Sequence, residues 1–371
     1  MRKASVLVTL VCLCLALFGT AVQAQTAPIF CSTLAQADCA ILQNVPAAGT
    51  GVNSTTFDFD LNIGVANVPG MPSQSMNFGL TGDGSWAIDP AVRASMAAMD
   101  PAAMDVAMLT SAVQAFDLDL TITLNLPQEL MAMAAAQSGQ APPSSITLEM
   151  LMVDGIGYLN FDQLVGLMPP NSGLPTGWQG LDFAEVVTMM GPSMGTMMGS
   201  GQVMNPSASI GKMDSATVAA MSEFTSITRL ADADINGMPV AVFQTNVDLV
   251  QLLNSDAVMS AMSSDPSTAM QMQQLSAVSD SLTAGNISIT QYVGLSDNIG
   301  YQTELLITAS MDPTAFDPTV PVGGTPVDIS VNGRFTQSNI NAAPAVSAPA
   351  GATLNPAEEL FGGMLGGMPQ S

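Results

Sequence analysis

A strict alternation of apolar and polar side chains over Phe116 to Leu126 constrains this chain more than any other feature of its sequence. Apolar residues fill every second position, and Asp, Thr and Asn fill the positions between them. Successive side chains of a strand point to opposite faces, so the segment has one apolar face and one wet face. This pattern is typical of an antiparallel sheet, because the strands of a parallel sheet are apolar on both sides.

Two hairpins are predicted from turn residues that lie between apolar runs. Asp154-Gly155 divides the segment Ile146 to Phe161, and Asn236-Gly237 lies between Ser226 to Ile235 and Val240 to Val247. Both residues of such a turn need positive φ, which Asp and Asn tolerate and Gly adopts freely. A single hairpin is barely stable in water, so these strands need neighbours and a layer over their apolar side.

The remaining elements follow in an order that predicts the fold class. Further strands are expected over Thr56 to Val68, Ser75 to Ile88, Ile287 to Leu295, Ile299 to Met311 and Val327 to Ser338. Asp83-Gly84 predicts a turn inside the second of these, and helical stretches are expected within 89–115, 161–224 and 248–281. No composition break marks a domain boundary. The order favours one α+β domain, a single large antiparallel sheet with helices packed on it.

The first residues have the three-part layout of a secretory signal peptide. Arg2 and Lys3 precede an apolar run, and Ala24 ends a short stretch that suits cleavage. We expect residues 1–24 to be removed and the mature protein to be soluble and extracytoplasmic, either periplasmic or secreted. Residues 25–54 are then an N-terminal segment, 55–341 the folded domain, and 342–371 a Pro-, Ala- and Gly-rich tail without ordered structure.

Cysteine content and charge agree with export. Cys31 and Cys39 are the cysteines that remain after signal removal, and in an oxidising compartment they predict a local disulfide. The chain has 30 acidic and 6 basic residues, for a formal net charge of −24. Such a molecule repels phosphate backbones, which argues against nucleic-acid binding.

The motifs that imitate active sites lack essential members. Gly191-Pro192-Ser193-Met194-Gly195 matches the G-x-S-x-G nucleophile elbow, but the sequence contains no histidine to serve as its base. Asp232, Asp234 and Asn236-Gly237 imitate the start of a calcium loop, yet the twelfth position holds Phe243 where a Glu is required. A hairpin turn with solvated acids is the preferred interpretation. We therefore predict no enzymatic activity and no cofactor.

Two further sets of side chains could hold a metal ion. The pairs Asp58/Asp60 and Asp117/Asp119 occupy the polar positions of their strands, which favours a solvated face over a cation site. Thioether sulfurs suit Cu(I), so a Met cluster makes an extracytoplasmic copper-binding protein an alternative function. The cluster consists of Met189, Met190, Met194, Met197, Met198 and Met204.

Several segments together resemble the superfamily of exported lipid and lipoprotein carriers that includes LolA, LolB and the LppX/LprG-type lipoproteins, closest in pattern to the latter. The matching segments are FDFDLNIGV, the hairpin strand with Tyr158 (DGIGYLNF), Gly177-Trp178, the midpoint turn INGMPVAVFQTNVDL and the closing FTQSNINAAPAVSAP. They span Thr55 to Pro349. The resemblance implies a strongly curved, half-open barrel whose concave apolar face holds acyl chains beneath a helical lid. The chain departs from the LppX-type pattern in lacking the lipid-anchor cysteine and in its Met-rich insertions.

The expected function is non-enzymatic binding of a lipid or other hydrophobic ligand in an apolar cavity under a Met-rich helical lid. The sequence has 28 Met, and Met adapts to irregular space and varied apolar ligands. The expected cavity residues are Phe57, Phe59, Leu61, Leu118, Leu120, Ile122, Leu148 and Met150. If these side chains instead form an ordinary filled core, the alternative is a secreted structural or surface protein. We expect a monomer with transient membrane or lipoprotein contact.

Overall fold

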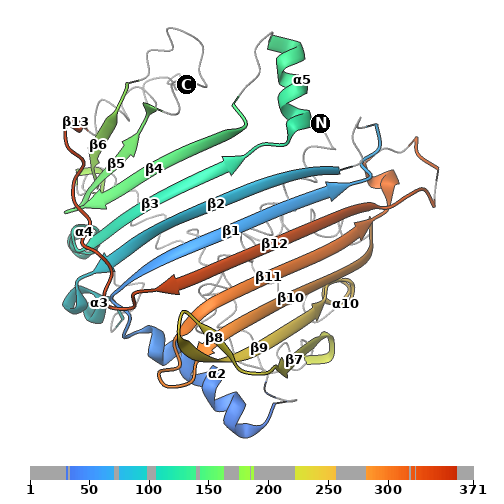
Figure 1. Ribbon diagram of the computed structural model, residues 1–371, viewed down its shortest axis with the longest axis horizontal. Coiled ribbons are helices and arrows are strands. Elements are labelled where there is room, and N and C mark those ends of the chain that lie inside the picture. Colours follow the sequence, from blue (N-terminus) through green and yellow to red (C-terminus); the bar gives the residue numbers. More distant parts are fainter. Residues whose placement is uncertain are drawn as a thin grey trace, which may run out of the picture.

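The computed structural model describes residues 31, 34–70, 75–97, 106–138, 143–162, 175–183, 185–187, 222–255, 281–316, 319–321 and 323–356. About half of these residues belong to one broad, curved sheet that does not close on itself (Figure 1). Its strands are β1 Ser54–Ala66, β2 Ser75–Ile88, β3 Phe116–Asn125, β4 Ser145–Val153, β5 Ile156–Asn160, β6 Trp178–Asp182, β7 Thr225–Arg229, β8 Ala233–Ile235, β9 Met238–Asp248, β10 Leu282–Gly294, β11 Gly300–Met311, β12 Val327–Ser338 and β13 Thr353–Asn355. The described helices are α2 Gln36–Gly49, α3 Pro90–Ala97, α4 Val106–Gln114, α5 Gln128–Ser138, α10 Leu249–Leu253 and the 3-10 turn η3 Pro313–Ala315.

At the centre of the 13-stranded sheet, the first strand, β1, pairs with the last long strand, β12. Its order is β13-β6-β5-β4-β3-β2-β1-β12-β11-β10-β9-β7, with β8 paired to β9. All pairs are antiparallel except the short pair β13 and β6. The predicted α+β fold, an open half-barrel built on one antiparallel sheet, is confirmed.

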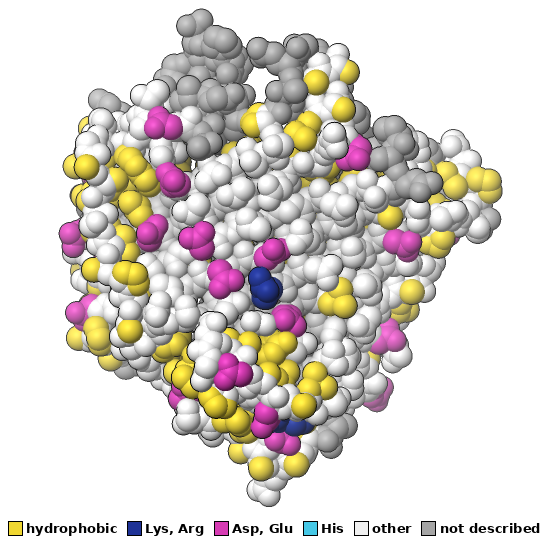
Figure 2. Space-filling model, viewed as in Figure 1, with side chains coloured by type: hydrophobic (Ala, Val, Ile, Leu, Met, Phe, Trp, Pro, Cys, Tyr) yellow, Lys and Arg dark blue, Asp and Glu magenta, His cyan; other side chains and the backbone are white. Residues whose placement is uncertain are grey.

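The two faces of the sheet differ in chemistry, as the alternation predicts. We call the side that carries Leu61 and its register partners the apolar face, and the side that carries Asp60 and its partner Arg334 the polar face. Figure 2 shows the polar face, which is mostly white with acidic side chains around a basic group near its middle. Over β1 to β4 the sheet therefore has one dry side, which must be covered, and one wet side. Near β8 and β9, Val240 and Val242 form a small buried cluster with Tyr301 on the side of the polar face.

Part of the apolar face is filled by a packed core. Over β1 and β10 to β12, buried side chains from the sheet pack against Leu249 and Leu253 of α10 and against Phe316. At another position on this face, Leu42 of α2 packs against Ile227 and Phe243. The described helices α10 and α2 therefore cover the β9–β12 half of the apolar face.

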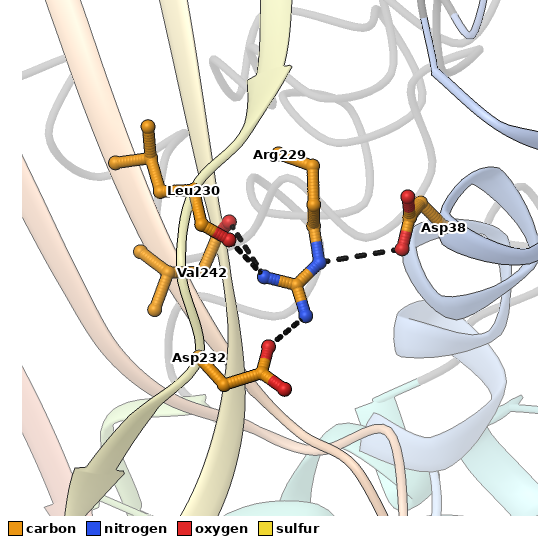
Figure 3. A network of polar contacts seen from close by, with 5 residues as sticks. All are labelled: Asp38, Arg229, Leu230, Asp232 and Val242. Carbon is orange, nitrogen blue, oxygen red and sulfur yellow. Dashed lines mark hydrogen bonds and ion pairs between the residues drawn. The ribbon is translucent and has the colours of Figure 1, made fainter.

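α2 is fixed by polar contacts and by a covalent bond. Arg229 of β7 donates from Nε to Asp38 of α2 at 3.3 Å, and its Nη2 also pairs with Asp232 (Figure 3). The Arg229 guanidinium lies 5.1 Å from the ring centroid of Phe243. Cys31 and Cys39 form the predicted disulfide, which joins α2 to the segment before it.

The turn predictions are confirmed in both hairpins and wrong in one strand. Asp154 and Gly155 have φ of 55° and 81°, and Asn236 and Gly237 have φ of 53° and 85°. In contrast, β2 continues through Asp83-Gly84, because both of its neighbours hold it in unbroken register there.

Other differences lie at the margins of the predicted elements. The helix α5 and the strand β6 lie where no such element is predicted, and β13 lies within the tail for which no ordered structure is expected. The predicted strand Ser226 to Ile235 is divided into β7 and β8. Of the helical stretches expected within 161–224 and 248–281, residues 163–174, 188–221 and 256–280 lie outside the described residues.

Candidate functional site

The predicted cavity residues share the apolar face and form rows across neighbouring strands. In one row Phe57 of β1 lies opposite Gly84 of β2, and Gly84 lies opposite Leu120 of β3. Leu120 in turn lies opposite Met150 of β4. Side chains at directly opposed positions of antiparallel strands contact one another, so this row is continuous.

A second row runs beside the first, two residues further along each strand. Phe59 lies opposite Gly82, and Gly82 lies opposite Ile122. Ile122 lies opposite Leu148 of β4. Together the rows make an apolar surface that extends over β1, β2, β3 and β4.

Glycines of β2 leave room for two phenylalanine rings of β1 to lie against the strand. A Cβ at Gly82 would come within 2.4 Å of Cζ of Phe59, and a Cβ at Gly84 within 3.0 Å of Cζ of Phe57. The rings therefore occupy the space that side chains of β2 would otherwise fill. Since β2 contributes no side chain of its own at these positions, the rings of Phe57 and Phe59 form the apolar surface between β1 and β3.

Exposure separates these rows from the packed core. Leu61 is only 3% exposed and belongs to the core under α10. The other predicted cavity residues are half-buried, except Met150, which is 38% exposed. Large apolar side chains that stand in rows and keep part of their surface open are what a binding surface for an apolar ligand requires.

The predicted lid falls outside the described residues. Met189, Met190, Met194, Met197, Met198 and Met204 all lie within 188–221, as does the G-x-S-x-G motif. Both the Met-rich lid and the Cu(I) alternative therefore remain predictions.

The acid pairs lie on the polar face, in agreement with a solvated role. Asp58 lies directly opposite Asp83. Burial, followed by the charges of Asp83 and Glu149, raises the pKa of Asp119 above its ordinary value. No group of three or more His, Cys, Asp or Glu suited to a metal ion exists within the described residues. These carboxylates repel one another without forming a described site.

The segment that imitates a calcium loop is a hairpin turn. The backbone N–H of Gly237 donates to Oδ1 of Asp234 at 2.6 Å, which closes the turn. Asp232 pairs with Arg229. Both carboxylates therefore have structural partners, and the preferred interpretation of this motif as a turn agrees with the structure.

A small pocket next to the first row contains a residue that sequence reasoning missed. Trp86, Ile88, Arg93 and Phe116 line a cavity of about 260 Å³. The Arg93 guanidinium lies 5.7 Å from the Trp86 ring centroid, and its Nη2 donates to the Gly49 carbonyl at 2.8 Å. Burial lowers the pKa of Arg93 below its ordinary value. The sequence does give one signal that could have singled out Arg93, which is that basic residues are few in this chain.

A second, larger hollow of about 570 Å³, less open than the pocket at Arg93, lies toward the other end of β1 and β12. It is formed by small side chains, and a Cβ at Gly64 would come within 2.7 Å of Oγ of Ser330. Asp328 at its rim accepts a hydrogen bond from Ser310 at 2.7 Å. The predicted cavity residues do not line this hollow.

Among the described helices, none combines the length and the hydropathy needed to span a bilayer.

Comparison with known proteins gives distant similarities of fold. No family model matches the chain, and no curated protein matches it. Among solved structures, the chain is similar to LprF from Mycobacterium bovis, at 12% identity over 85% of this chain and 99% of that one, with a TM-score of 0.31. It is also similar to the lipoprotein LppX from Mycobacterium tuberculosis, at 9% identity over 84% and 98% of the two chains, with a TM-score of 0.28.

A LolA superfamily protein from Nitrosomonas europaea shows 8% identity over 82% of this chain and 94% of that one, with a TM-score of 0.15. These neighbours are of the kind that the sequence resemblance names. At these identities and scores the similarity is one of fold alone.

Proposed function

We propose that this protein is an exported, non-enzymatic binding protein that holds a lipid or other hydrophobic ligand against the apolar face of β1 to β4. The observation that carries the proposal is the pair of apolar rows, half-buried and side by side, with Gly82 and Gly84 beneath the rings of Phe59 and Phe57. The Met-rich segment 188–221 would complete the enclosure as a lid.

Binding in this proposal is passive and needs no covalent step. Burial of apolar surface contributes about 25 cal/mol per Å², so an acyl chain laid along the rows gains affinity in proportion to its length. The absence of histidine from the sequence removes the commonest general base. The half-buried rows therefore favour a carrier or receptor.

A secreted structural protein is the second candidate, and the packed core under α10 favours it. There the same apolar face is fully covered by side chains of the chain itself. If the covering extended over β2, β3 and β4, no space for a ligand would remain.

Mass spectrometry of an organic extract from the native, detergent-free protein separates the two candidates. We expect a co-purified lipid, and a clean extract together with no uptake of added fatty acid would refute the carrier. Within the rows, Leu120→Gln places an amide on the apolar face, whereas Thr123→Gln places it on the polar face of the same strand. We expect the first variant to weaken ligand binding about tenfold and the second to leave it unchanged.

A further inference from the structure

The charge of Arg93 is the feature that the proposed function leaves unused. Arg93 lies on α3, half-buried, with its guanidinium stacked on Trp86. Within the described part of the chain, its side chain has one hydrogen bond, to the Gly49 carbonyl, and no carboxylate within ion-pair distance. A guanidinium has five N–H donors, so most of its hydrogen-bonding capacity is unused there.

The other described arginines are placed differently. Arg229 pairs with both Asp38 and Asp232 (Figure 3). Arg334 lies on the polar face, where its register partners on the two adjoining strands are Asp60 and Glu304. Arg93 is therefore the described cation that lies beside the apolar face without an acidic partner. Its nearest acid in sequence, Asp89, caps α3 by accepting from the N–H groups of Ala91 and Val92.

The Arg93 guanidinium lies close to one end of the apolar rows. Trp86 lies opposite Leu118 in the register of β2 and β3, and it stacks on Phe116 with ring centroids 6.5 Å apart. Leu118 is followed on the same face by Leu120, which belongs to the first row. The small pocket at Arg93 is thus continuous with one end of the proposed ligand surface.

We propose, resting on the lipid-binding function above, that the ligand is an amphiphile with an anionic head group, carboxylate or phosphate, that pairs with Arg93 while its chain lies on the apolar rows. Arginine suits this role because its planar fork binds carboxylate and phosphate through two parallel hydrogen bonds. Trp86 and Phe116 line the pocket beside the guanidinium, so an anionic group bound there would lie next to the apolar rows. The net charge of −24 makes this local cation the exception to a surface that otherwise repels anions.

The test compares one acyl chain with and without its charge. Parinaric acid and its methyl ester share a fluorescent chain, so each can be titrated into the full-length mature protein. We expect the wild type to bind the acid about tenfold more tightly than the ester, and Arg93→Gln to remove that preference while leaving ester affinity unchanged. Arg334→Gln, which removes the same charge from the polar face, should keep the preference.

The outcomes distinguish the two proposals. Equal affinity of the wild type for acid and ester, or an undiminished preference in Arg93→Gln, overturns the role of Arg93 and leaves the carrier intact. Failure of the wild type to bind either compound overturns both. Acetate and inorganic phosphate, which have the charge without the chain, should not compete, and competition by either would indicate an ion site instead. Arg93→Lys keeps the charge and should retain a reduced preference, so the test holds if Arg93→Gln does not fold.

Discussion

At the scale of single residues, Gly82 and Gly84 decide the shape of the proposed binding surface. Sequence reasoning interprets Asp83-Gly84 as a turn, because Asp-Gly is a strong turn signal. In the structure the same glycine lies inside an unbroken strand, where the ring of Phe57 and the carbonyl of Asp119 leave no room for a Cβ. A sequence pattern records which residues tolerate a conformation, and it does not record which neighbours exclude a side chain.

Gly84→Ala should therefore destabilise the protein. A Cβ at this position would lie 2.1 Å from the backbone oxygen of Asp119, which cannot move without disturbing β3. We expect a loss of about 1–3 kcal/mol in the free energy of unfolding, measured by urea denaturation. Gly79→Ala on the same strand is the control, because its nearest contact would be an ordinary 3.4 Å. Equal losses in both variants would contradict this account.

Tyr301 gives a residue-scale prediction for alkaline pH. Its hydroxyl donates to Oδ2 of Asp297 at 2.7 Å, and burial together with this bond raises the pKa of Tyr301 to about 12, from an ordinary value of 10.0. The folded state therefore holds the proton more tightly than the unfolded state. Stability from this group is fully present below pH 10 and is lost as the pH rises toward 12.

Thermal unfolding as a function of pH tests this prediction. The wild type should lose stability between pH 10 and about 12, and Tyr301→Phe should lose less over the same interval. An identical alkaline decline in both proteins would show that other groups cause it.

At the scale of elements, the alternation predicts strands well because it reports burial directly. β1, β2, β3 and β12 lie close to their predicted ranges, and both hairpin turns have the positive φ values that their residues indicate. β6 and β13 are too short to show an alternation, and β13 depends on pairing with a segment distant in sequence. Such contacts leave no local signal.

The helix α2 should contribute to stability through one face. Leu42 is 5% exposed and packs in a cluster with Ile227 and Phe243, whereas the neighbouring Gln43 is exposed. We expect Leu42→Ala to cost about 2–5 kcal/mol in unfolding free energy and Gln43→Ala to change it little. A small effect at Leu42 would show that α2 is dispensable for the fold.

At the scale of the whole molecule, the two halves of the sheet should differ in local stability. The β10–β12 half contains the packed core under α10, and the β2–β4 half carries the half-buried rows. Amide hydrogen exchange measured by mass spectrometry should therefore be slower in β10 to β12 than in β2 to β4 of ligand-free protein. Added fatty acid should slow exchange in the second half, and uniform exchange across the sheet would contradict this difference.

The sequence predicted the single large sheet correctly, but it did not predict that helices cover one half of the apolar face more fully than the other. Every predicted cavity residue lies on one face, since a two-residue period suffices to place it there. The two-residue period does not predict how deeply each side chain is buried. Leu61 is packed under α10 while Leu120 is partly exposed, because burial depends on which helix folds back onto which strands. Arg93 was not identified from the sequence for the same reason, because its contact with Trp86 depends on how α3 folds back onto β2.

The short pair of β13 and β6 has a consequence for how readily copies of the protein associate with one another. An open sheet always presents two rims with unused backbone donors and acceptors, to which foreign strands can add. Here one rim ends in three residues, Thr353–Asn355, running parallel to their neighbour, and the other in the five residues of Thr225–Arg229. Rims this brief offer little template for polymerisation, and the strand next to β13, β6 Trp178–Asp182, is also only five residues long.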